Sequence, residues 1–66
     1  MNKVKGYRNM IGYSQEEMAK ALNIKRDTYR LKEAGERQFT QEEMVAFLNE
    51  IKKVDASVTL DLIFLK

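Results

Sequence analysis

The side chains best suited to binding chemistry lie close together near positions 25 to 37. Lys25, Arg26 and Arg30 are cationic, and Asp27 stands between the two arginines. A guanidinium group presents five N–H donors in a rigid fork, a geometry that matches the oxygens of phosphate and carboxylate groups. This stretch is therefore equipped to recognise an anionic or strongly polar partner.

The charges of the chain are unevenly divided. Residues 1 to 37 hold nine Lys and Arg against five Asp and Glu, whereas residues 38 to 66 hold three against five. The formal net charge of +2 thus separates into +4 for the first part and −2 for the second. Such an asymmetry favours a polyanionic partner for the first part. On charge alone, a merely solvated surface remains the alternative.

The composition argues against an enzyme. The chain contains no Cys and no His, so the commonest general base and the commonest transition-metal ligand are missing. Its ten carboxylates are scattered, with no pair at the spacing of acid–base catalysis. We therefore expect no catalytic residue, metal, cofactor or small-molecule ligand. The apolar runs are far shorter than the roughly 20 residues needed to cross a bilayer, so we expect no membrane partner.

Helices must position the charged stretch. Good helix formers dominate, Pro is absent and strand-like alternation is nearly absent. The residues suited to capping helix starts are Asn2, Ser14 with Glu17, Thr40 with Glu43, and Thr59, and those suited to turns at helix ends are Gly12, Asn23 and Gly35. The chain is predicted to form one all-α domain over residues 1–66. Its expected helices span about 2–11, 15–22, 26–34, 41–53 and 60–64.

The spacing of apolar residues predicts which helix faces are buried. In the third helix we place Tyr29 at the centre of the inner face, with Glu33 about 40° and Arg26 about 60° from it. Asp27, Arg30 and Leu31 then fall on the other side. In the fourth helix the expected inner stripe is Met44, Phe47, Leu48, Ile51 and Val54.

A family pattern covers nearly the whole chain. The residues that carry it are Ser-Gln-Glu-Glu-Met-Ala from position 14, Leu-Asn-Ile from position 22, then Tyr29, Glu33 and Gly35, followed by Phe39-Thr40 and the terminal Val-Thr-Leu-Asp-Leu-Ile-Phe. This pattern resembles the helix-turn-helix of the Xre/Cro family of phage and bacterial repressors. The resemblance implies a small five-helix, repressor-like DNA-binding domain whose third helix enters the major groove.

Two positions depart from the family pattern. Asn23 stands where the family usually has Gly, a mild change because Asn tolerates the left-handed conformation of such a turn. Lys32 stands where the family usually has an aliphatic residue. We expect Lys32 to lay its stem on the core and to keep its ammonium group in water.

The resemblance also implies roles for individual residues. The base-reading candidates are Lys25, Arg26, Asp27, Arg30 and Leu31, and the phosphate-binding candidates are Gln15, Thr28 and Arg37. Either arginine can pair with O6 and N7 of guanine, while Asp27 is expected to orient Arg30 or to accept from cytosine. For each base-reading candidate, phosphate contact or plain solvation remains open. Arg8 and Glu33 are expected to form a structural ion pair between the first and third helices, and Gln15 to brace the third.

The expected function is that of a repressor in the cytoplasm of a bacterial or phage-infected bacterial cell. It would bind a near-palindromic double-stranded DNA operator as a homodimer, with half-sites about 34–36 Å apart. Phe64 and Leu65 are the predicted dimer contact if they are exposed; otherwise they only cap the core. The alternative is an antitoxin or antirepressor-like protein-interaction module on the same fold. Steep weakening of binding with salt would favour DNA.

Overall fold

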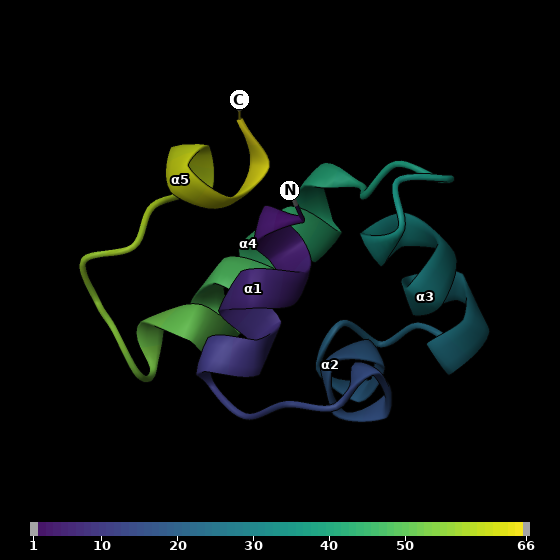
Figure 1. Ribbon diagram of the computed structural model, residues 1–66, viewed down its shortest axis with the longest axis horizontal. Helices are drawn as coiled ribbons and strands as arrows, with labels where there is room; N and C mark the ends of the chain where they lie inside the picture. The colour runs from purple at the N-terminus through teal and green to yellow at the C-terminus, as the bar shows by residue number, and fades with distance from the viewer. Residues whose placement is uncertain (1, 66) are drawn as a thin grey trace.

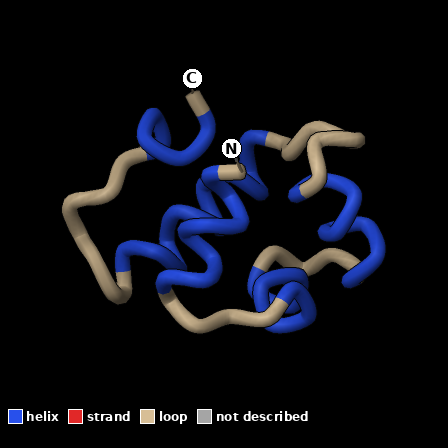
Figure 2. The backbone as a smooth tube through the Cα atoms, viewed as in Figure 1, coloured by secondary structure: helices blue, strands red, loops and turns tan. Residues whose placement is uncertain are grey.

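The computed structural model describes residues 2–65, and every regular element in that range is a helix (Figure 2). The elements are α1 (Lys3–Met10), α2 (Gln15–Ala21), α3 (Arg26–Glu33), α4 (Gln41–Lys52) and α5 (Leu60–Phe64). The predicted all-α, five-helix architecture is therefore confirmed, with each boundary within one residue of its expected position. None of the described helices is both long enough and apolar enough to cross a membrane.

Side chains at the helix starts explain where α2 and α4 begin. Ser14 Oγ accepts a hydrogen bond from the Glu17 amide at 3.0 Å, and Glu17 Oε1 accepts one from the Ser14 amide at 2.8 Å. Thr40 and Glu43 repeat this reciprocal arrangement at 3.1 and 2.9 Å. These two predicted capping boxes satisfy backbone donors that the helix itself cannot satisfy.

A left-handed residue sets the turn between α2 and α3. Asn23 has φ = 59°, as the sequence predicts for a residue at this turn. Its short polar side chain tolerates a conformation that most residues avoid. The chain then reverses, and the Ile24 amide donates to the Ala19 carbonyl at 3.0 Å. This turn allows α3 to pack directly against α2.

The core lies where all five helices converge. It consists of Met18, Ala19, Leu22, Tyr29, Phe47, Ile51, Val58 and Ile63. α2 packs against α3 and α4, whereas α5 packs against α1 and α4. In Figure 1, α3 and α5 consequently lie at opposite sides of the molecule. α3 is thus held by α2 with one side open to solvent.

The inner stripe of α4 is shorter than predicted. Phe47 and Ile51 are fully buried, but Val54 is 63% exposed, so its predicted burial is wrong. The helix ends at Lys52, and the chain turns away before position 54. Val58, four residues later, supplies the buried contact instead.

Phe64 is half-buried and packs against the core. Its ring lies edge-on to Phe39 and Phe47, with centroid distances of 5.4 and 5.6 Å. Phe39 in turn meets the ring of Tyr29 at 6.0 Å. For Phe64, these contacts favour the alternative stated above, in which its ring caps the core. Leu65, which follows the end of α5, is exposed.

Candidate nucleic-acid interface

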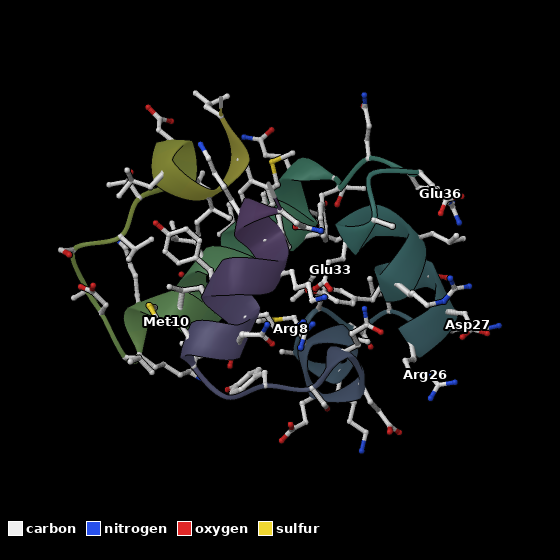
Figure 3. The ribbon with its side chains drawn as sticks, viewed as in Figure 1. Arg8, Met10, Arg26, Asp27, Glu33 and Glu36 are labelled. Carbon is white, nitrogen blue, oxygen red and sulfur yellow. The ribbon has the colours of Figure 1, made fainter. Side chains whose placement is uncertain are left out.

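α3 has a buried face and an exposed face. Tyr29, Lys32 and Glu33 are buried, whereas Lys25, Arg26, Asp27 and Arg30 are exposed. Figure 3 shows Arg26 and Asp27 projecting outward from the edge of the molecule. The placement of Tyr29 at the centre of the inner face is thus confirmed, and the exposed Arg26 and Arg30 can meet a partner.

The charges at the start of α3 are only loosely paired. Arg26 Nη2 lies 3.8 Å from Asp27 Oδ1, and both side chains are largely exposed. In the described part of the chain, Asp27 makes no ion pair with Arg30, the residue that it is expected to orient; its carboxylate lies beside its neighbour Arg26. Lys25 occupies the N-cap position with extended backbone and makes no capping hydrogen bond with its side chain.

The remaining predicted candidates around α3 differ in exposure. Thr28 and Leu31 are half-buried, and Arg37 is exposed in the loop that follows the helix. The Leu31 carbonyl accepts hydrogen bonds from the amides of Glu36 and Arg37, at 2.9 and 3.3 Å. This loop therefore keeps Arg37 close to the C-terminal end of α3.

A buried ion pair joins α3 to α1. Arg8 Nε donates to Glu33 Oε2 at 2.8 Å, and Arg8 Nη2 donates to Glu33 Oε1 at 3.0 Å. The two side chains meet in the interior (Figure 3). The Tyr29 hydroxyl also donates to Glu33 Oε2, and Arg8 Nη1 donates to the Tyr13 carbonyl at 2.7 Å. A fork-to-fork pair of this kind fixes orientation as well as distance.

The pKa values of this cluster favour its charged form. Burial raises the pKa of Glu33, but hydrogen bonds from Arg8, Tyr29 and Gln15 more than offset this, so its pKa lies below the usual value. The hydrogen bond with Glu33 raises the pKa of Arg8. Burial, together with the bond to Glu33, raises the pKa of Tyr29 well above its ordinary value. The pair is ionised at neutral pH, and its guanidinium is already engaged within the protein.

Gln15 connects this interior cluster to the surface. Its side-chain nitrogen donates to Glu33 Oε1 at 3.1 Å, which leaves its amide oxygen and second N–H for another partner. A hollow formed by α1, α2 and α3 surrounds it, lined by Lys5, Arg8, Ser14, Gln15, Glu16 and Arg26. Lys5 is a cationic side chain that we did not single out from the sequence. Its position three residues before Arg8, on the same face of a helix, is the signal that points to it.

The environment of Lys32 differs from the expectation. The side chain is buried, and its ammonium group donates to Glu43 Oε1 at the start of α4. The prediction that this ammonium remains in water is therefore wrong. The capping box of α4 brings the Glu43 carboxylate to the rim of the core, within reach of the lysine stem.

The fold and this exposed cationic helix together define a helix-turn-helix DNA-binding domain. A family model described as helix-turn-helix matches residues 4–57. The chain therefore belongs to the helix-turn-helix family, of the Xre/Cro type, and is a DNA-binding transcriptional regulator. Comparisons with curated proteins and with solved structures found no match.

Proposed function

We propose that this chain is a sequence-specific repressor that reads the major groove of double-stranded DNA with α3. The observation that carries the proposal is the division of α3 into a fixed and a free face. Its inner face is locked by Tyr29 and Glu33, while Arg26 and Arg30 are exposed. The major groove is about 12 Å wide and accepts one α-helix, so the exposed face can approach the base edges.

The side chains of α3 match the donors and acceptors of the groove. Arg26 and Arg30 each supply a fork that fits O6 and N7 of guanine, worth about 1–3 kcal/mol of discrimination per pair. Asp27 can accept from N4 of cytosine, and Lys25 can donate to guanine. Leu31, being half-buried, offers a smaller apolar contact to a thymine methyl group.

Phosphate contacts would orient the helix in the groove. Gln15 and Lys5 line the hollow formed by α1, α2 and α3, and Arg37 lies in the loop after α3. Thr28, half-buried on α3, is a further candidate. In this proposal, Lys5 and Gln15 contact phosphate from the hollow that Arg26 also lines, and Arg37 contacts phosphate from beyond the end of α3.

We further propose that the regulator acts as a homodimer on a near-palindromic operator. Leu62, in α5, and Leu65, directly after it, are 52% and 59% exposed. Exposed apolar side chains of this kind are suited to a contact between two copies. Membership of the Xre/Cro type supports the cytoplasm of a bacterial or phage-infected cell as the place of action.

Selection from a pool of random duplex DNA tests this function. The wild-type protein should enrich a two-fold-related motif with half-sites about 34–36 Å apart, and sedimentation should show two protein chains on each selected duplex. Failure to enrich any motif would contradict sequence-specific binding. It would favour the antitoxin or antirepressor-like reading, in which the fold binds another protein.

A matched pair of variants tests the role of α3. Arg30→Ala should lower the ratio of affinities for the selected duplex and a random duplex by about 5- to 150-fold, the value of one arginine–guanine pair. Lys52→Ala removes the same charge from an exposed position on α4 and should leave this ratio unchanged. Equal weakening of selected and random duplex by Arg30→Ala would show that Arg30 contacts only phosphate.

A further inference from the structure

Two consecutive residues at the end of α3 make buried ion pairs with different helices. Glu33 pairs with Arg8 of α1, and Lys32 pairs with Glu43 at the start of α4. Neighbouring residues of an α-helix point about 100° apart around its axis. α1 and α4 therefore contact α3 through ion pairs on two well-separated sides of its circumference.

We propose that the Lys32–Glu43 ion pair is a positioning pair that sets the rotation of α3 about its own axis. Through that rotation it determines which base edges Arg26 and Arg30 can reach. The inference rests on the proposed reading of DNA by α3 for its functional consequence. Its structural content, a fixed rotation of α3, concerns the free protein as well.

The burial of the pair distinguishes it from an ordinary surface contact. The side chains of Lys32 and Glu43 are 7% and 12% exposed. The same carboxylate oxygen accepts the Thr40 amide at 2.9 Å, so Lys32 is tied to the capping box of α4. Burial raises the pKa of Glu43, but the hydrogen bonds from Lys32 and Thr40 lower it by a larger amount. The pKa therefore lies below its ordinary value, and the carboxylate is ionised at neutral pH.

A hydrogen-bonded ion pair can fix the rotation of α3, whereas an apolar contact cannot. An aliphatic side chain at position 32 would have nearly the same burial energy over a range of α3 rotations, because apolar burial is non-directional. A hydrogen-bonded ion pair accepts only a narrow range of distance and angle. A rotation of about 10° moves a side-chain tip at a radius of about 6 Å by about 1 Å, which exceeds the tolerance of a hydrogen bond. Small rotations therefore decide whether Arg26 and Arg30 fit a given base.

The test separates positioning from stability. Lys32→Met with Glu43→Gln removes both charges together, leaves no lone buried charge, and keeps an amide oxygen for the Thr40 cap. Replacing a buried ion pair in this way often leaves stability unchanged or improves it. Lys53→Met is the matched control, because it removes the cation of the exposed Lys53–Glu50 pair at the end of α4.

Two measurements decide the outcome. Residual dipolar couplings of α3 amides, relative to those of α1 and α4, report the orientation of α3 in the DNA-free protein. Binding to the duplex selected by wild-type protein, relative to a random-sequence duplex of equal length, reports discrimination. For the double variant we expect altered α3 couplings, an unchanged or higher urea midpoint, and a loss of discrimination of about tenfold or more. The control should match wild type in both measurements.

The two proposals can fail separately. Wild-type couplings and wild-type discrimination in the double variant would overturn the positioning role and leave DNA reading intact. A wild-type protein that enriches no duplex would contradict DNA reading, while the couplings alone would still decide whether the pair sets α3. Should the double variant unfold, Lys32→Met alone takes its place, because it removes the buried cation while Glu43 keeps the hydrogen bond from the Thr40 amide. Couplings identical to wild type would again overturn the proposal.

Discussion

The side-chain amide of Gln15 donates to Oε1 of Glu33, the carboxylate that joins α3 to α1. Glu33 therefore receives hydrogen bonds from three side chains on three helices: Arg8 of α1, Gln15 of α2 and Tyr29 of α3 itself. The outermost of these, Gln15, is also a phosphate-binding candidate. Gln15 thus takes part both in the hydrogen-bond network of Glu33 and in the proposed DNA-binding surface.

Neutralising Glu33 should strongly destabilise the fold. Glu33→Gln leaves the guanidinium of Arg8 buried without an anion, and such a change typically costs about 3–5 kcal/mol. The free energy of unfolding, measured in urea, should fall by that amount. Asp27→Asn makes the same chemical change on an exposed side chain and should leave unfolding unchanged. Equal effects of the two variants would show that the buried pair contributes no special stability.

The same cluster should make the fold sensitive to acid. The pKa of Glu33 is lowered in the native state, because hydrogen bonds outweigh the effect of burial. The native state therefore holds fewer protons than the unfolded chain, in which a Glu side chain has a pKa of about 4.3. The stabilisation is fully present above this value and is lost as pH falls through the native pKa.

Tyr29→Phe tests this dependence without removing the carboxylate. It deletes one donor to Glu33, so the pKa of Glu33 should move back toward its ordinary value. The expected result is lower stability at neutral pH, by about 1 kcal/mol. The loss of stability between about pH 5 and pH 3 should also be shallower than in wild type. Tyr7→Phe is the control, since no hydrogen bond of the Tyr7 hydroxyl is found among the described residues. Parallel pH curves for wild type and Tyr29→Phe would contradict the coupling.

Local chemistry made much of this fold predictable. The capping boxes of Ser14 and Thr40 depend only on residues three positions apart, and Asn23 adopts the left-handed turn that its own side chain tolerates. The burial of Tyr29 follows from helical periodicity alone. The exposed charges of α3 then follow from geometry, because the side opposite a buried residue faces solvent.

The errors arose where distant parts of the chain meet. Lys32 is buried because Glu43, eleven positions later and already engaged in a capping box, is brought against it by the packing of the helices. Phe64 is covered because the loop before α4 carries Phe39 to the same place as α5. Periodicity within a single helix contains no information about such partners.

The glycines predict two opposite effects of the same added methyl group. Gly6 lies inside α1 and Gly35 follows α3 with φ = +84°, yet a Cβ at either would meet no atom within 4 Å. Gly6→Ala should therefore stabilise the fold by about 0.5–1 kcal/mol, because Ala loses less conformational entropy in a helix. Gly35→Ala should destabilise it by about 1–2 kcal/mol, the cost of a left-handed conformation. Thermal unfolding of the two variants checks the signs, and shifts in the same direction would contradict the argument.

Phe64 and Leu65 are neighbours, but we expect one to affect folding and the other to affect the association of two chains. Phe64 packs edge-on to Phe39 and Phe47, so Phe64→Ala should lower the free energy of unfolding by about 3 kcal/mol. Leu65 has an exposed side chain, so Leu65→Ser should leave unfolding nearly unchanged and should weaken association of two chains on DNA. Urea unfolding and sedimentation on a selected duplex distinguish the two effects. A Leu65→Ser protein that still binds the duplex as a dimer of wild-type affinity would exclude Leu65 from the contact between copies, and the same measurement on Leu62→Ser would then show whether α5 takes part at all.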